Sequence, residues 1–130
     1  MTSQSSGINE ELLLNWGSRI GLAAKIENVR SSQLENLIAS LDVFESKEAL
    51  LITAAFALRQ AERLNSGRTM ARLVSQAMLD LYEKGGGKED ARRTLGFAKW
   101  VYEALGTKTI KHLKPDQVTL LELLKQLSGR

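Results

Sequence analysis

The sequence predicts an all-α fold, a compact single-domain bundle of five to six helices. Apolar residues recur three and four positions apart instead of alternating, which is the spacing of an amphipathic helix. Proline occurs once, and no segment has the alternating, β-branched composition that is typical of strands. The 130 residues, of which 43% are hydrophobic, suffice to fill one core. We therefore expect one domain over residues 1–130, with residues 1–8 disordered.

The first two helices are predicted from their capping residues. Asn9 is a good N-cap for a first helix that runs to about Asn28, with a candidate break at Gly17. Ser32 and Glu35 have the spacing of a capping box, in which each side chain binds the other residue's backbone N–H. They predict a short second helix that begins at Ser32.

The third helix is predicted to lie at the centre of the core. Ser46 is its expected N-cap, and residues 49–58 are apolar nearly all the way round. A helix that is apolar on every side is usually buried on most of them. The residues that we expect to be buried are Leu51, Ala54, Ala55 and Leu58.

The second half of the chain predicts three more helices. The first two cover residues 68–84 and 88–105, and the three glycines at 85–87 form the hinge between them. Gly106 is placed to end the second of these helices. The final helix is expected to begin at Pro115, because proline suits the first helical position.

The residue inventory argues against catalysis. Cysteine is absent and His112 is the only histidine, so a metal site would depend on carboxylates for its other ligands. The glycine-rich segment before Lys88 is not a phosphate-binding loop, because Glu89 stands where that loop needs serine or threonine. Glu89 and Asp90 are explained as favourable charges at a helix start. We expect no enzymatic activity, no metal and no cofactor.

The chain carries no recognisable targeting signal. Its polar start lacks the basic and apolar regions of a signal peptide, and no apolar run approaches the length of a membrane span. The absence of cysteine agrees with a reducing compartment. We expect a cytoplasmic protein that does not contact a membrane.

Positive charge is concentrated in the later part of the chain. Residues 1–50 hold four basic and seven acidic side chains, a net charge of −3, whereas residues 51–130 hold fourteen and eight, a net charge of +6. Such asymmetry favours an anionic partner, for example a nucleic acid.

Two clusters of basic residues are candidate contacts for such a partner. In the first, two i,i+4 pairs flank the turn at residues 65–67; they are Arg59, Arg63, Arg68 and Arg72. The alternative is that nearby acidic residues neutralise them, namely Glu62, Asp80 and Glu83. The second cluster interleaves cations with aromatic rings, as proteins that bind unpaired bases do; its cations are Arg92, Arg93 and Lys99. Trp100 is a candidate for base stacking or for a subunit interface, and Phe97 is better explained by the core.

Three segments of the chain resemble the small α-helical subunit of CRISPR effector complexes, most closely that of type III-A complexes. They are residues 32–37 (SQLENL), residues 50–63 (LLITAAFALRQAER) and residues 96–105 (GFAKWVYEAL). The small subunits of type III-B and type I-A complexes also resemble this chain and remain as alternatives. The family's pattern extends to Arg59 and Arg63, whereas the other basic candidates follow from charge and helical spacing alone.

The resemblance implies a noncatalytic protein of antiviral defence that is present in several copies along a ribonucleoprotein filament. Its implied partners are guide RNA, target RNA, the other subunits of the complex and further copies of itself. The main alternative is a helical adaptor that docks an acidic protein through Trp100 and the basic corner.

Overall fold

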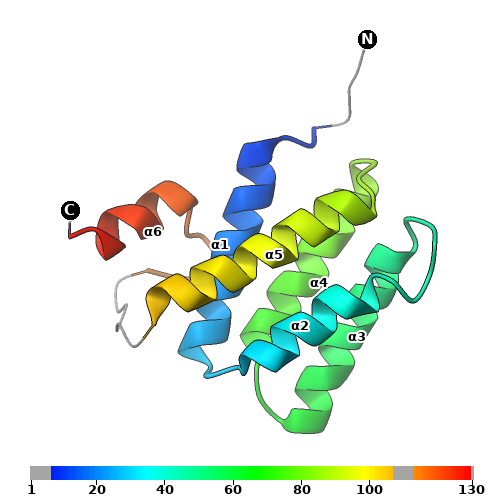
Figure 1. The fold of residues 1–130 in the computed structure, drawn as a ribbon, viewed down its shortest axis with the longest axis horizontal. Coiled ribbons are helices and arrows are strands. Elements are labelled where there is room, and N and C mark those ends of the chain that lie inside the picture. Colours follow the sequence, from blue (N-terminus) through cyan, green and yellow to red (C-terminus); the bar gives the residue numbers. More distant parts are fainter. Residues whose placement is uncertain (1–6, 107–112, 130) are drawn as a thin grey trace.

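The computed structural model describes residues 7–106 and 113–129, and within these ranges it contains six helices and no strand (Figure 1). The predicted all-α bundle is therefore confirmed. No helix in these ranges is long and apolar enough to cross a membrane. The helices are α1 (Glu10–Ile26), α2 (Ser31–Ser40), α3 (Ala49–Leu64), α4 (Arg68–Glu83), α5 (Lys88–Leu105) and α6 (Leu120–Leu127).

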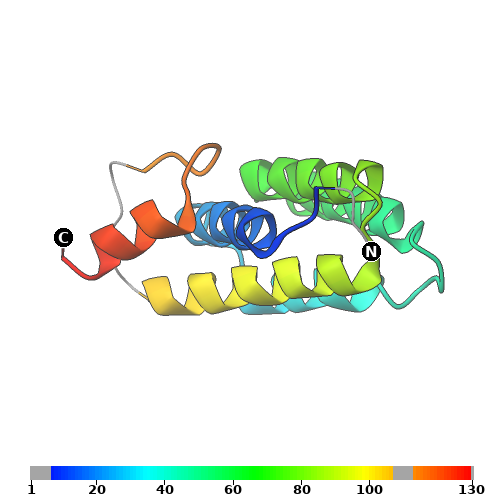
Figure 2. The same ribbon diagram turned by 90° about the horizontal axis from the view of Figure 1, so that it is seen from above.

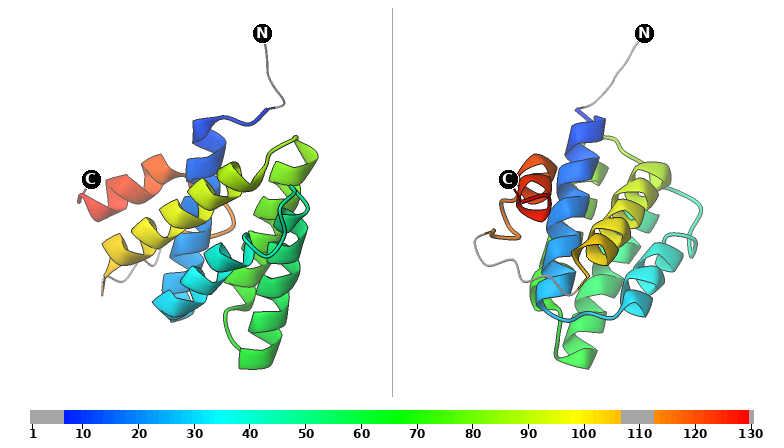
Figure 3. Two further views of the ribbon diagram at one scale, coloured as in Figure 1. Left: turned by 45° about the vertical axis from the view of Figure 1, so that its right-hand side comes forward. Right: turned by 60° about the vertical axis from the view of Figure 1, so that its left-hand side comes forward.

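Helix α1 packs against α5 and α4, and α2 and α3 complete the bundle through contacts with each other, with α5 and with α4. Viewed from above, α2 and α5 form one layer and α3 and α4 form the other (Figure 2). The turned views show α3 and α4 as a side-by-side antiparallel pair (Figure 3). Helix α6 lies at the far end of the molecule from the α2–α3 connection (Figures 1 and 2). The groove described below lies at the opposite end of α2 from this connection, between the start of α2 and the second half of α3.

Helix α1 runs unbroken through Gly17, so the predicted break is wrong. Its start is as predicted, because the Asn9 side chain accepts a hydrogen bond from the Leu12 amide at 2.8 Å. The glycines of α1 serve instead to admit α5. A Cβ atom added at Gly21 would lie 2.6 Å from the Ala98 carbonyl oxygen, so only glycine permits this close approach of the two helices.

The starts of α2 and α3 differ by one to three residues from the predictions. Helix α2 begins at Ser31, and its cap is a hydrogen bond from the Arg30 amide to Gln33 Oε1 at 2.7 Å. The predicted capping box of Ser32 and Glu35 is therefore wrong. Ser46 lies in the turn before α3, where its hydroxyl accepts a 3.3 Å hydrogen bond from the Glu48 amide.

Helix α3 is buried on one face only, which corrects the prediction of a helix buried on most sides. Of the four expected core residues, Ala54 is buried and Leu51 is partly buried, whereas Ala55 is exposed and Leu58 is 49% exposed. The reason is position: α3 lies at the edge of the bundle and packs mainly against α4, with α2 along one side.

The junction of α4 and α5 matches its prediction. Gly85 adopts a left-handed conformation with a φ of 84°. The Gly86 amide donates to the Leu81 carbonyl at 2.7 Å, and the Gly87 amide donates to the Asp90 carboxylate at 3.0 Å. Asp90 thus caps the start of α5 and needs no catalytic role to explain it.

The last helix begins five residues later than predicted. Pro115 lies in a turn, and α6 starts at Leu120 after Thr119, whose hydroxyl accepts a hydrogen bond from the Glu122 amide. One side of this helix faces the bundle. Leu123 is fully buried, while the residues that remain exposed on α6 include Leu121 and Leu124.

Candidate nucleic-acid interface

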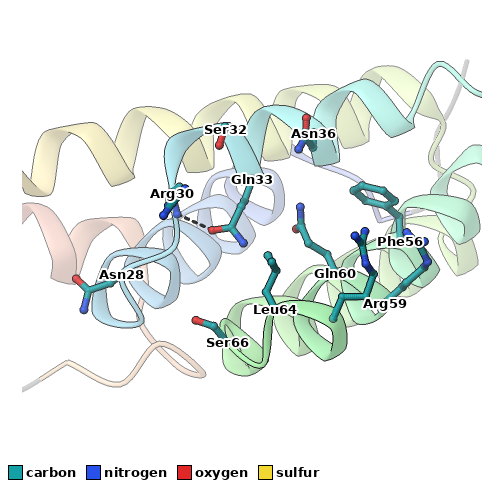
Figure 4. Close-up of a pocket in the computed structure, with 11 residues that line it drawn as sticks. Asn28, Arg30, Ser32, Gln33, Asn36, Phe56, Arg59, Gln60, Leu64 and Ser66 are labelled. Atoms are coloured by element: carbon teal, nitrogen blue, oxygen red, sulfur yellow. Dashed lines mark hydrogen bonds between the residues drawn. The ribbon is translucent and has the colours of Figure 1, made fainter.

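A groove of about 500 Å³ lies between the start of α2 and the second half of α3 (Figure 4). Its basic lining residues are Arg30, Arg59 and Arg63. Its neutral polar lining residues are Asn28, Ser32, Gln33, Asn36, Gln60 and Ser66, and its apolar lining residues are Phe56 and Leu64. No acidic side chain lines it.

The three arginines of this groove, hereafter the groove arginines, form no ion pair with any described residue. Neither Arg30, Arg59 nor Arg63 has a carboxylate of residues 7–106 or 113–129 within the 4.0 Å of an ion pair. All three are exposed. Their guanidinium groups are therefore available to an anionic ligand without first breaking an internal pair.

Local structure explains how the groove arginines come together. Arg59 and Arg63 are one turn apart on α3 and so share one side of the helix. Arg63 also lies in the last turn of α3, where a positive charge favours the helix dipole. Arg30 comes from a different element, the residue before α2. The helix dipole explains a positive charge at Arg63 only. The charges of Arg59 and Arg30 have no such explanation in the described part of the chain.

The wall of the groove that contains Arg30 is fixed to the start of α4. Glu27, the residue after α1, accepts hydrogen bonds from the backbone amides of Thr69 at 3.0 Å and Met70 at 2.8 Å. The next residue, Asn28, adopts a left-handed conformation with a φ of 57°, which turns the chain toward α2. One carboxylate therefore links the α1–α2 corner to the α3–α4 turn.

The other two arginines of the first predicted cluster are held in ion pairs and do not line the groove. Arg68 binds Glu62 at 2.7 Å and Arg72 binds Asp116 at 2.9 Å. The hydrogen bond from Arg68 lowers the pKa of Glu62 below its ordinary value. The turn at residues 65–67 thus places Arg68 beside an acidic residue instead of beside the groove arginines.

Two cations of the second predicted cluster are likewise paired, and they connect α5 to α2 and the loop after it. Arg92 binds Asp42 at 3.0 Å and Glu89 at 3.3 Å. Lys99 binds Glu35 at 2.7 Å. The hydrogen bond from Arg92 lowers the pKa of Asp42, and the hydrogen bond to Glu35 raises the pKa of Lys99. These contacts link elements that are far apart in the sequence.

Arg93 belongs to another surface. Its side chain is exposed and lines a shallow pocket with residues of α1, namely Glu10, Leu13 and Leu14. This pocket shares no lining residue with the groove between α2 and α3. The predicted set of cations is therefore divided among separate parts of the molecule.

Trp100 is 70% exposed and lies away from the groove arginines. It borders an apolar groove of about 210 Å³ between α5 and α6, to which no charged side chain contributes. Its ring centroid is 6.3 Å from that of Phe97, which is partly buried. This setting suits an apolar contact better than stacking of a base beside bound phosphates.

Arg30 is the groove residue that sequence reasoning missed. It lies within residues 1–50, whose net charge is negative, so the charge distribution did not predict a cationic contact there. The signal available was local: a single cation directly before the start of a short helix. Within the described ranges no group of three or more histidine, cysteine, aspartate or glutamate side chains is placed to hold a metal ion, and His112 lies outside those ranges.

Comparison of the chain with known protein families, with curated proteins and with solved structures finds no match.

Proposed function

We propose that this chain is a noncatalytic RNA-binding subunit that contacts the phosphate backbone of RNA through the groove between α2 and α3. The observation that carries the proposal is the set of three groove arginines, exposed and without a carboxylate partner among the described residues, around a groove with no acidic lining. Phosphate oxygens are natural ligands for guanidinium groups, which bind them through paired hydrogen bonds.

The choice among RNA-binding proteins rests on the sequence resemblance described above. It favours the small subunit of a CRISPR effector complex, with guide RNA, target RNA, neighbouring subunits and further copies of the chain as partners in the cytoplasm. Arg59 and Arg63 support this choice, because they match the family's pattern and also line the groove. Arg68, Arg72, Arg92 and Lys99 are secondary contacts in this proposal, since each is engaged in an ion pair.

The proposal is tested by replacing Arg59 and Arg63 together with glutamine and measuring RNA affinity over a range of salt concentrations. Each lost phosphate contact lowers the slope of log affinity against log salt by about 0.7 to 0.9, so the double variant should lose about 1.4 to 1.8 units. Affinity should fall by a similar factor for RNAs of unrelated sequence, because phosphates carry no sequence information.

The matched control replaces Arg68 and Arg72, which are also one turn apart but are ion-paired. It should change the slope less, because those guanidinium groups are already neutralised. Circular dichroism verifies that both variants fold. If the Arg59 and Arg63 variant keeps the RNA affinity and salt slope of the unmodified chain, alone and in an assembled complex, the assignment of the groove is wrong.

A second candidate function is that of a helical protein adaptor. The observation that favours it is the apolar groove between α5 and α6, which is lined by the exposed side chains of Trp100 and Leu124. An adaptor would bind its acidic partner but would show no RNA binding at moderate salt. The same titration therefore distinguishes the two functions.

A further inference from the structure

Two glutamines face each other across the groove between α2 and α3. Gln33 projects from α2 and Gln60 projects from α3, each toward the opposite helix (Figure 4). Both residues are partly buried and line the groove. A ligand held by the groove arginines would therefore lie against two amide groups.

The hydrogen bonds of these amides determine which atoms a ligand would meet. Gln33 Oε1 accepts the Arg30 amide at 2.7 Å, which fixes the orientation of the side chain and leaves its Nε2 group as a donor. Gln60 forms no side-chain hydrogen bond with the residues that the structure describes, so both its donor and its acceptor are available. Together the two residues present at least one fixed donor and one acceptor.

We propose that Gln33 and Gln60 bind the ribose 2′-hydroxyl of the strand whose phosphates the groove arginines hold, and so make the groove selective for RNA over DNA. The inference rests on the proposed function. Arginines do not distinguish the two nucleic acids, because both have the same phosphates. The 2′-hydroxyl is a donor and an acceptor that DNA lacks. It accepts a hydrogen bond from Gln33 Nε2 and donates one to Gln60 Oε1.

The test compares two labelled oligonucleotides of equal length, oligouridylate and oligodeoxyuridylate, which differ only in the 2′-hydroxyl. Their affinities for the full chain are measured by fluorescence anisotropy at one salt concentration. The unmodified chain should bind the RNA more tightly. Gln60→Met keeps the length of the side chain but removes its hydrogen bonds, and should lower RNA affinity about two- to tenfold, the effect of one net hydrogen bond, with DNA affinity unchanged.

The matched control is Gln76→Met, at an exposed glutamine of α4 that does not line the groove. It should leave both affinities unchanged. Gln33→Met should resemble Gln60→Met, and thermal unfolding is measured alongside because Gln33 also caps α2.

The outcomes separate this inference from the proposed function. Equal binding of RNA and DNA by the unmodified chain, or equal losses for both in Gln60→Met, overturns ribose recognition while leaving phosphate binding intact. If neither oligonucleotide binds, or if binding does not depend on the groove arginines, the proposed function fails and the ribose contact fails with it.

Discussion

The two faces of α3 differ in burial, although both are apolar over much of their length. The inner face is fully packed and is built mostly from short side chains; its residues are Ala49, Leu50, Thr53, Ala54, Ala57 and Ala61. The outer face is also apolar over its first half, yet Ala55 and Leu58 are exposed there. Toward its C-terminal end the outer side presents Arg59 and Arg63. Apolar composition alone therefore does not show which side of a helix is covered.

The position of α3 at the edge of the bundle explains the difference, because its inner face packs against α4. Alanines on the inner face let α4 pack closely, since the distance between two helices depends on the side chains at their contact. The apolar residues of the outer face, among them Ala55 and Leu58, have no such neighbour and remain exposed. Arg59 and Arg63 continue this uncovered side, so the same edge position that exposes Leu58 also makes Arg59 accessible to a ligand.

The largest effect is expected from paired truncations on the two faces. Leu50 is fully buried, so Leu50→Ala should lower the free energy of unfolding by about 2 to 5 kcal/mol. Leu58 is half exposed, and Leu58→Ala should cost about 1 kcal/mol or less. Urea unfolding followed by circular dichroism gives both values. Equal losses would show that the outer face is covered in solution and would remove the contrast between the faces.

A smaller effect is expected from the one polar contact of the inner face. The hydroxyl oxygens of Ser40 and Thr53 lie 2.7 Å apart in the core, and Ser40 donates its proton to the Leu37 carbonyl at 2.6 Å. Thr53 must therefore be the donor of the pair. Ser40→Ala leaves this buried donor without its acceptor and should cost about 1 to 3 kcal/mol, whereas Thr53→Val should cost about 1 kcal/mol. The same unfolding experiment measures both, and the opposite order would reverse the assigned donor.

The smallest effect concerns the charge on the outer face and its dependence on pH. The hydrogen bond from Arg68 lowers the pKa of Glu62 in the folded state. The resulting stabilisation is present above the unfolded pKa of about 4.3 and is lost as pH falls through the lower folded value. The unfolding temperature should therefore drop between pH 6 and pH 3, and less so in Glu62→Gln.

Glu83→Gln is the control for this experiment, because Glu83 is exposed and forms no ion pair in the described part of the chain. It should retain the full pH dependence. An identical response of both variants would mean that the pair of Glu62 and Arg68 adds nothing to stability in solution.

Most of the fold was predictable because helical signals are local. The spacing of apolar residues indicated the helices, and Asn9 and the glycines at 85–87 marked boundaries that the structure confirms. One error arises because tertiary packing decides: Gly17 admits α5 instead of breaking α1. The other has a local cause, because α6 is capped by Thr119 and Glu122 and therefore starts after Pro115.

The candidate site was predictable only in part, because ion pairs join residues that are far apart in the sequence. Arg72 is neutralised by Asp116, 44 positions away, and Lys99 by Glu35, 64 positions away. Helical spacing shows which cations lie together but not which acidic residues reach them. Arg59 and Arg63 were identified from such spacing, whereas Arg30 joins them only through the packing of α2 beside α3.

The two hydrogen bonds of Glu27 have a consequence for how the groove would bind. They tie the α1–α2 corner to the first turn of α4, and α4 in turn packs along α3, which forms the opposite wall of the groove. The distance between the two walls of the groove is thus fixed before a ligand binds. In such a preorganised site the loss of conformational entropy on binding falls mainly on the ligand. A flexible strand would order itself on a rigid template, and the groove would keep its shape between successive ligands.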